Sequence, residues 1–183
     1  MSTATASLDA SSTMKQVLEA YPGAQRALFR RDHIGGCSSC GFQPEETLGQ
    51  LCARNGQLSV AEVIEHIRTS QAEDERLLIS PTEAAALMAA DRHARFLDVR
   101  SREEFDSAAV PGSQLLTQDL MNEMLSRWPR DKTFIVIDHQ GRRCLDAAAY
   151  FLGHGFTHVR ALRGGIDAWS QEVDRGIPRY RLG

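Results

Sequence analysis

The chain has 183 residues and is 42% hydrophobic, which suits one large folded domain or two small ones and excludes a fibrous protein. Its 24 acidic residues outnumber its 21 basic ones, giving a formal net charge of −3, and this balance disfavours binding to nucleic acid or to an anionic membrane surface. The first 12 residues do not have the pattern of a signal peptide, and no apolar run reaches the roughly 18 residues that span a membrane, so we expect a cytoplasmic protein.

The first part of the sequence predicts a small helical domain at residues 13–70, after a disordered N-terminus at residues 1–12. Thr13 and Ser59 each begin a capping box, and apolar residues follow both at helical spacing. The four helices expected here begin at Thr13, at Ala24, after Pro44 and at Ser59. Residues 71–76 contain three acids and predict a solvated linker.

Two cysteines in this helical domain have the spacing CxxC. Cys37 and Cys40 lie in a glycine-flanked loop between predicted helices, where two thiols approach closely enough for a disulfide or for a shared metal ion. With Cys52, and with His33 or His66, they supply three or four ligands for zinc or an iron–sulfur cluster. Two alternatives stay open, a loop whose thiols have no redox or metal role and a Cys52 that is only a buried helix residue.

From residue 77 to residue 180 the predicted elements alternate between strands and helices. This alternation predicts an α/β domain whose parallel sheet is covered by helices on both faces. The strands are expected at residues 77–79, 95–100, 114–116, 133–137 and 159–162, and Ser80, Ser101 and Thr117 are expected to cap helices. A ligand of such a sheet binds at the carboxyl ends of its strands.

The loop after residues 133–137 is the best candidate for a functional site. These five residues predict a buried strand, and an alanine-rich helix follows within six or seven residues. Backbone N–H groups of the loop and the first helical turn therefore point at one small volume that favours an anion. The residues concerned are Asp138, His139, Gln140, Gly141, Arg142, Arg143 and Cys144.

This loop resembles the active-site loop of the rhodanese-like sulfurtransferases, whose pattern is a catalytic cysteine, two variable residues, glycine, another residue, arginine and serine. Gly141 and Arg143 match that pattern, Cys144 falls where serine is usual, and Asp138 falls where the catalytic cysteine is expected. The resemblance covers residues 77–180 and implies the rhodanese-like fold for them. Three further runs carry it: Leu97-Asp-Val-Arg100 with Glu103-Glu-Phe105, the turn Val110-Pro-Gly-Ser113, and the closing motif Leu162-Arg-Gly-Gly-Ile-Asp-Ala-Trp169.

The aspartate changes what the resemblance implies about activity. Rhodanese chemistry holds a sulfur atom on a thiolate as a persulfide, and a carboxylate cannot form that bond. We therefore expect a binding or thiol-carrying module without thiosulfate sulfurtransferase activity. The alternative is an active sulfurtransferase that carries sulfur on Cys144 or on the pair Cys37 and Cys40. Three roles stay open for Asp138. Its carboxylate fills the anion site, forms part of a docking surface for a partner, or accepts a phosphoryl group. His139 is either a solvent-facing loop residue or an acid–base group.

Residues 14–70 resemble the small helical domain of hybrid-cluster-associated redox-disulfide proteins and of iron–sulfur repair proteins. The residues that carry this likeness are Val17-Leu-Glu-Ala-Tyr-Pro22, His33-Ile-Gly-Gly-Cys-Ser-Ser-Cys40 and Glu46-Thr-Leu48. The likeness implies a redox disulfide, or zinc or an iron–sulfur cluster, at Cys37 and Cys40. Both resemblances imply a protein partner in sulfur or iron–sulfur assembly, and the oligomeric state is left open.

Overall fold

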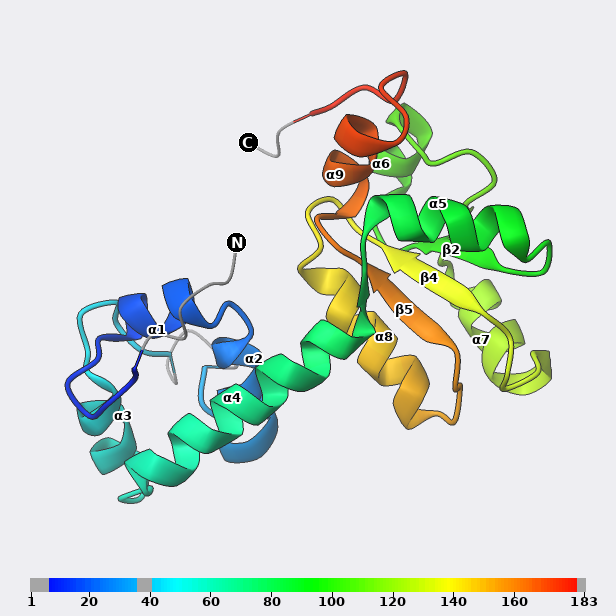
Figure 1. The fold of residues 1–183 in the computed structure, drawn as a ribbon. Helices are drawn as coiled ribbons and strands as arrows, with labels where there is room; N and C mark the ends of the chain where they lie inside the picture. Colours follow the sequence, from blue (N-terminus) through cyan, green and yellow to red (C-terminus); the bar gives the residue numbers. More distant parts are fainter. Residues whose placement is uncertain (1–6, 36–40, 181–183) are drawn as a thin grey trace. The chain divides into compact units, whose positions relative to one another are not determined.

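The computed structural model describes residues 7–35 and 41–180, and the chain divides into two compact units, residues 1–76 and 77–183. The N-terminal unit is helical and the C-terminal unit contains a sheet (Figure 1). Among the described residues, no helix is both long and apolar enough to cross a membrane.

The described part of the N-terminal unit contains four helices, α1 (Met14–Ala20), α2 (Ala24–Asp32), α3 (Leu48–Arg54) and α4 (Val60–Leu77). Each of them contributes apolar side chains to one core, whose fully buried members include Val17, Leu28, Leu51 and Ile67. The helix predicted at Thr13 is confirmed with its capping box.

Helix α3 begins at Leu48, and the predicted start after Pro44 is wrong. Thr47 accepts a hydrogen bond from the Gln50 amide and the Gln50 side chain accepts one from the Thr47 amide, so a capping box that the sequence analysis did not identify starts the helix three residues later than expected. Residues 44–46 instead serve helix α1, because the first two amides of α1 donate to the carbonyls of Glu46 and Pro44 at 2.8 and 2.9 Å.

Residues 71–76, where the sequence predicts a linker, belong to the last turns of α4. The helix continues because Asp74 is almost fully buried and pairs with Arg26 of α2. A buried carboxylate in a helix is tolerated when a cation compensates it, and here that cation comes from a residue 48 positions earlier in the chain.

The C-terminal unit contains a five-stranded parallel sheet, as predicted, and its strand order is β1-β5-β4-β2-β3. The strands are β1 (Leu78–Ile79), β2 (Arg95–Asp98), β3 (Gln114–Leu115), β4 (Phe134–Ile137) and β5 (Val159–Leu162). The helices are α5 (Pro81–Ala90), α6 (Arg102–Ser107), α7 (Gln118–Arg127), α8 (Arg143–Gly153) and α9 (Gly165–Glu172).

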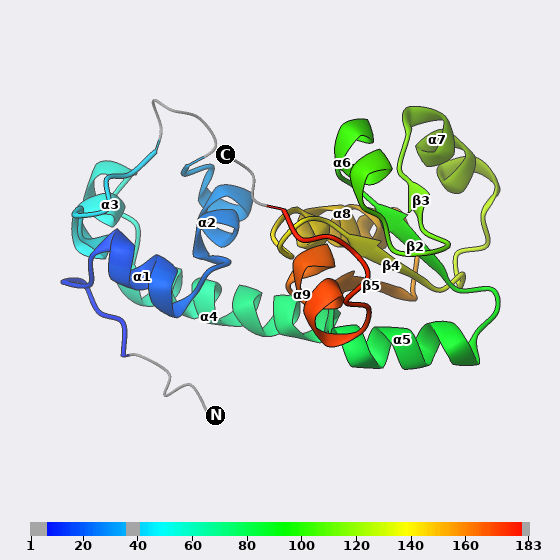
Figure 2. The same cartoon turned by 90° about the horizontal axis from the view of Figure 1, so that it is seen from above.

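Helices cover both faces of this sheet, and alternate side chains of the central strand explain why. Ile135 and Ile137 of β4 join the core that α5 and α9 cover, whereas Phe134 and Val136 join the core under α7 and α8. The views from the side and from above (Figures 1 and 2) show α5 and α9 against the opposite face from α8. Strand β4 is therefore buried on both faces, and its carboxyl end delivers the next residues to the rim of the sheet.

Candidate functional site

The carboxyl ends of β2, β4 and β5 meet at one edge of the sheet, and the predicted site loop lies there. Asp98 ends β2, Asp138 follows β4 directly, and Gly164 and Gly165 join β5 to α9. Residues 138–142 form the connection from β4 to α8, so the loop lies where a parallel sheet binds its ligands.

The carboxylate of Asp138 lies at the centre of the loop and is only 2% exposed. Its Oδ1 accepts a hydrogen bond from the Gly141 amide, and its Oδ2 accepts from the amides of Arg143 and, at 3.2 Å, Cys144. Helix α8 has no side-chain cap of its own at Arg142. Asp138 thus supplies the negative charge that the first amides of the helix favour.

The backbone of the loop packs on the turn that starts α9. The carbonyls of Asp138 and His139 accept hydrogen bonds from Ile166 and Asp167 at 2.9 and 3.1 Å. A Cβ on Gly165 would lie 2.5 Å from the Asp138 carbonyl oxygen, so glycine is needed there for the two segments to approach. Two helices therefore hold the loop. Amides of α8 donate to the Asp138 carboxylate, and amides of α9 donate to the backbone carbonyls of Asp138 and His139.

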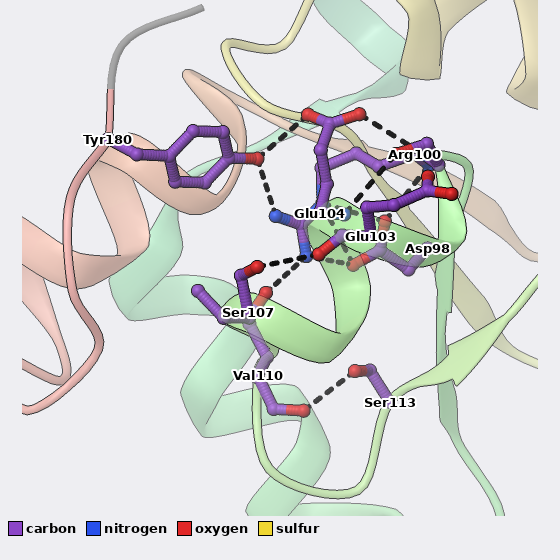
Figure 3. Close-up of polar contacts among 10 residues, drawn as sticks. Asp98, Arg100, Glu103, Glu104, Ser107, Val110, Ser113 and Tyr180 are labelled. Carbon is purple, nitrogen blue, oxygen red and sulfur yellow. Dashed lines mark hydrogen bonds and ion pairs between the residues drawn. The ribbon is translucent and has the colours of Figure 1, made fainter.

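A buried polar network lies beside the loop, at the end of β2 (Figure 3). The Arg100 guanidinium donates to both carboxylate oxygens of Asp98, at 2.6 to 3.1 Å, and both side chains are fully buried. Arg100 also donates to the Tyr180 hydroxyl at 2.7 Å and to the Ala108 carbonyl at 2.6 Å. The Tyr180 hydroxyl donates in turn to Glu104 at 2.9 Å. The network joins β2, α6 and the C-terminal segment.

The pKa shifts in this network follow from burial and hydrogen bonding. Burial alone would lower the pKa of Arg100, but its hydrogen bonds to Asp98 and Tyr180 outweigh burial and raise that pKa. Burial raises the pKa of Tyr180, so the phenol keeps its proton at neutral pH and can donate it to Glu104. Burial would raise the pKa of Glu104, yet donation from the Ser101 amide and from Tyr180 dominates and lowers it.

The other loop residues divide into buried and exposed ones. His139 is only 5% exposed, so the interpretation of His139 as a solvent-facing residue is wrong. Its ring stacks on Tyr180 and its Nε2 lies 3.0 Å from the Tyr180 carbonyl oxygen. Gln140, Arg142 and Arg143 are exposed and form the outer surface of the loop.

Cys144 lies on the first turn of α8 but faces the core and has no exposed surface. Its Sγ is 3.7 Å from the Leu162 carbonyl oxygen of β5. A sulfur carrier must meet its donor and its acceptor, so this position disfavours Cys144 in that role.

The cysteines of the N-terminal unit are only partly described. Cys37 and Cys40 lie outside the described residues. Cys52 is 2% exposed in the core of this unit, and burial together with nearby Asp32 raises the pKa of its thiol, which makes it a poor thiolate ligand. His66 instead makes a 3.0 Å hydrogen bond with the Ala27 carbonyl. Among the described residues, no three His, Cys, Asp or Glu side chains are grouped to hold a metal ion.

Sequence reasoning missed Tyr180 as part of this site. The motif at residues 97–105 indicates Asp98, Arg100 and Glu104, but Tyr180 lies 80 residues after Arg100 in the chain. Only in the folded chain does the Tyr180 hydroxyl lie between the side chains of Arg100 and Glu104.

The site loop therefore lies between a strand and a helix at the carboxyl edge of a parallel α/β sheet. A model of the rhodanese-like domain matches residues 80–172, which is half of the chain. The chain therefore belongs to the rhodanese-like family, as a sulfurtransferase homologue with additional helices before the domain.

Several named sulfurtransferases are similar to part of this chain. The chain is 32% identical over 91 residues to the thiosulfate sulfurtransferase GlpE of Pseudomonas savastanoi pv. phaseolicola, covering 50% of this chain and 84% of that protein. It is 26% identical over 170 residues to the adenylyltransferase and sulfurtransferase UBA4 of Candida albicans, covering 88% of this chain but only 38% of that protein. It spans 26% of the length of the probable adenylyltransferase/sulfurtransferase MoeZ of Mycobacterium tuberculosis. The human single-domain sulfurtransferase TSTD1 is 24% identical, with a TM-score of 0.46 over 52% of this chain and 96% of its own.

Proposed function

We propose that this protein is a rhodanese-like module that does not carry sulfur on its active-site loop, because Asp138 holds the position of the persulfide-forming cysteine. The observation that carries the proposal is the Asp138 carboxylate, which accepts hydrogen bonds from three amides of the loop and of α8. Those amides are the donors that an anionic substrate or a persulfide would use. Because the Asp138 carboxylate already bonds to these amides, its negative charge occupies the anion site that they form.

The module then acts through binding, with a protein partner in sulfur or iron–sulfur metabolism. The partner would bind the exposed surface of the site loop. This surface is formed by the side chains of Gln140, Arg142 and Arg143. We assign the thiol-carrying role to Cys37 and Cys40 of the N-terminal unit. Support for the sulfur context comes from the family and from relatives whose names state sulfurtransferase activity.

The test is a thiosulfate–cyanide assay. In rhodanese chemistry a thiolate attacks the outer sulfur of thiosulfate, sulfite leaves, and cyanide then removes the sulfur as thiocyanate and restores the thiolate. We expect no thiocyanate from the wild type and a gain of at least about tenfold over background from Asp138→Cys, since the amides that would stabilise a thiolate are already in place. Asp138→Asn, which has a similar shape but no sulfur, is the matched control and stays inactive.

Two results would contradict the proposal. One is wild-type turnover that disappears in Cys144→Ser, which would make the site loop an active sulfur carrier. The other is a folded Asp138→Cys protein that gains no sulfur atom by mass after thiosulfate treatment, which would show that position 138 is not the seat of the nucleophile. Iron and zinc analysis of protein purified without oxygen, compared with Cys37→Ser, tests the metal alternative separately.

A further inference from the structure

The described C-terminal residues 177–180, which we call the C-terminal strap, run back over the site loop. The base of the strap is Ile177, which is 7% exposed and belongs to the core beneath α5 and α9. The remaining anchors are polar. Arg179 donates to both carboxylate oxygens of Asp167, at 2.7 and 3.0 Å, and Tyr180 reaches the network of Arg100 and Glu104 (Figure 3).

Tyr180 covers His139. The two rings are stacked, with centroids 4.3 Å apart and an angle of 11° between their planes. The Tyr180 carbonyl can only accept a hydrogen bond, so His139 Nε2, at 3.0 Å, carries the proton and donates it. In the neutral ring Nδ1 then holds the free lone pair, and the 5% exposure of His139 shows how fully it is covered.

One polar anchor of the strap, Arg179, ends on a residue that holds the loop. Asp167, the partner of Arg179, donates its amide to the His139 carbonyl at 3.1 Å. Arg179 is 56% exposed, so its ion pair is screened by water and holds only weakly. Release of the outer end therefore depends mainly on the contacts of Tyr180, while Ile177 keeps the base of the strap in the core.

We propose that the strap is a movable cover of the site loop, closed in this structure by Tyr180, and that its release exposes His139 and the loop to solvent and to small reactants. The cover works whether or not Asp138 replaces a catalytic cysteine. Its test is therefore independent of the sulfur-transfer assay.

The experiment is histidine modification by diethylpyrocarbonate on the full chain, followed by mass spectrometry of each histidine. The reagent attacks an unprotonated ring nitrogen, and exposed His93 serves as the internal reference. Tyr180→Ala is expected to raise the His139 rate at least tenfold relative to His93. Tyr180→Phe keeps the stack but loses the hydroxyl bonds and gives a smaller rise. Tyr150→Ala removes a tyrosine that is 43% exposed on α8 and leaves the His139 rate unchanged.

Opening of the strap must also occur in the wild type without global unfolding. We expect a measurable wild-type His139 rate that Phe151→Ala, a core variant of the same unit, does not change. A rate that rises with the loss of global stability overturns the proposal, as does a His139 rate in Tyr180→Ala equal to that of the wild type. If Tyr180→Ala does not fold, Tyr180→Phe and Arg179→Ala decide, and unchanged His139 rates in both overturn it.

Discussion

Gly165 is one of the residues on which the position of the loop depends. Its φ of +60° lies in the left-handed region, and an added Cβ would meet the carbonyl groups of Asp138 and His139 at 2.5 to 2.6 Å. Those carbonyls are the acceptors for the first amides of α9. A side chain at 165 would therefore have to separate the loop from the helix that holds it, in addition to straining the backbone.

We expect Gly165→Ala to lower the free energy of unfolding of the C-terminal unit by about 2–4 kcal/mol, since it combines backbone strain with a backbone clash. Gly112→Ala is the control, because Gly112 has a φ of +80° but no atom within 4 Å of the added Cβ. It should cost only about 1–2 kcal/mol. The measurement is urea unfolding followed by tryptophan fluorescence, and equal losses in the two variants would contradict the role assigned to Gly165.

Helix starts show which part of the fold sequence predicts and which part it does not. The capping boxes at Thr13, Ser80 and Ser101 are confirmed, because all of their groups lie within four consecutive residues. The connection between β4 and α8 is likewise predicted from a strand followed closely by a helix, and in the structure it spans residues 138–142. A local pattern is not always sufficient, because the capping box of Thr47 and Gln50 is equally local and the sequence places the start of α3 after Pro44 instead.

Two of the errors have distant partners. Helix α4 continues through residues 71–76 because Asp74 pairs with Arg26, and His139 is buried because Tyr180 stacks on it. Each pairing joins residues more than 40 positions apart, and no single stretch of sequence contains both. Periodicity and capping signals cannot show a compensating charge or a covering ring that arrives from another part of the chain.

At the start of α6, Glu104 links a helix cap to the C-terminal strap. Its lowered pKa means that the folded state favours the carboxylate, so its contribution to stability is complete above the usual glutamate pKa of about 4.3 and is lost as the pH falls below it. We expect Glu104→Gln to lower the free energy of unfolding by about 0.5–1 kcal/mol at pH 7. The difference from the wild type should shrink at pH 3.

Urea unfolding at both pH values measures this difference. Asp106→Asn changes the same charge on the same helix, at a side chain that is 62% exposed and 3.9 Å from Arg102, and should have little effect at either pH. A Glu104→Gln deficit that stays the same at pH 3 would mean that packing, and not the carboxylate, explains the loss.

At the scale of the whole molecule, each of the two units has a core of its own. The core of the N-terminal unit draws all of its buried members from residues 8–67, and the two cores of the C-terminal unit draw theirs from residues 79–177. Both tryptophans, Trp128 and Trp169, lie in the C-terminal unit. Tryptophan fluorescence therefore reports on the sheet alone, whereas far-UV circular dichroism reports on the helices of both units.

We expect the two cores to be destabilised separately. Leu51→Ala removes a fully buried side chain of the N-terminal core and should cost about 2–5 kcal/mol, which moves the circular dichroism transition and leaves the fluorescence midpoint in place. Phe151→Ala removes a ring that packs edge-on against Phe134 and Phe156, with centroids 5.1 and 5.7 Å away, and should cost about 3–5 kcal/mol at the fluorescence transition. If both variants shift one shared transition in both signals, the two units unfold as one cooperative body. A redox or metal change at Cys37 and Cys40 would then alter the stability of the site loop as well. Separate transitions would mean that such a change alters the stability of the N-terminal unit alone.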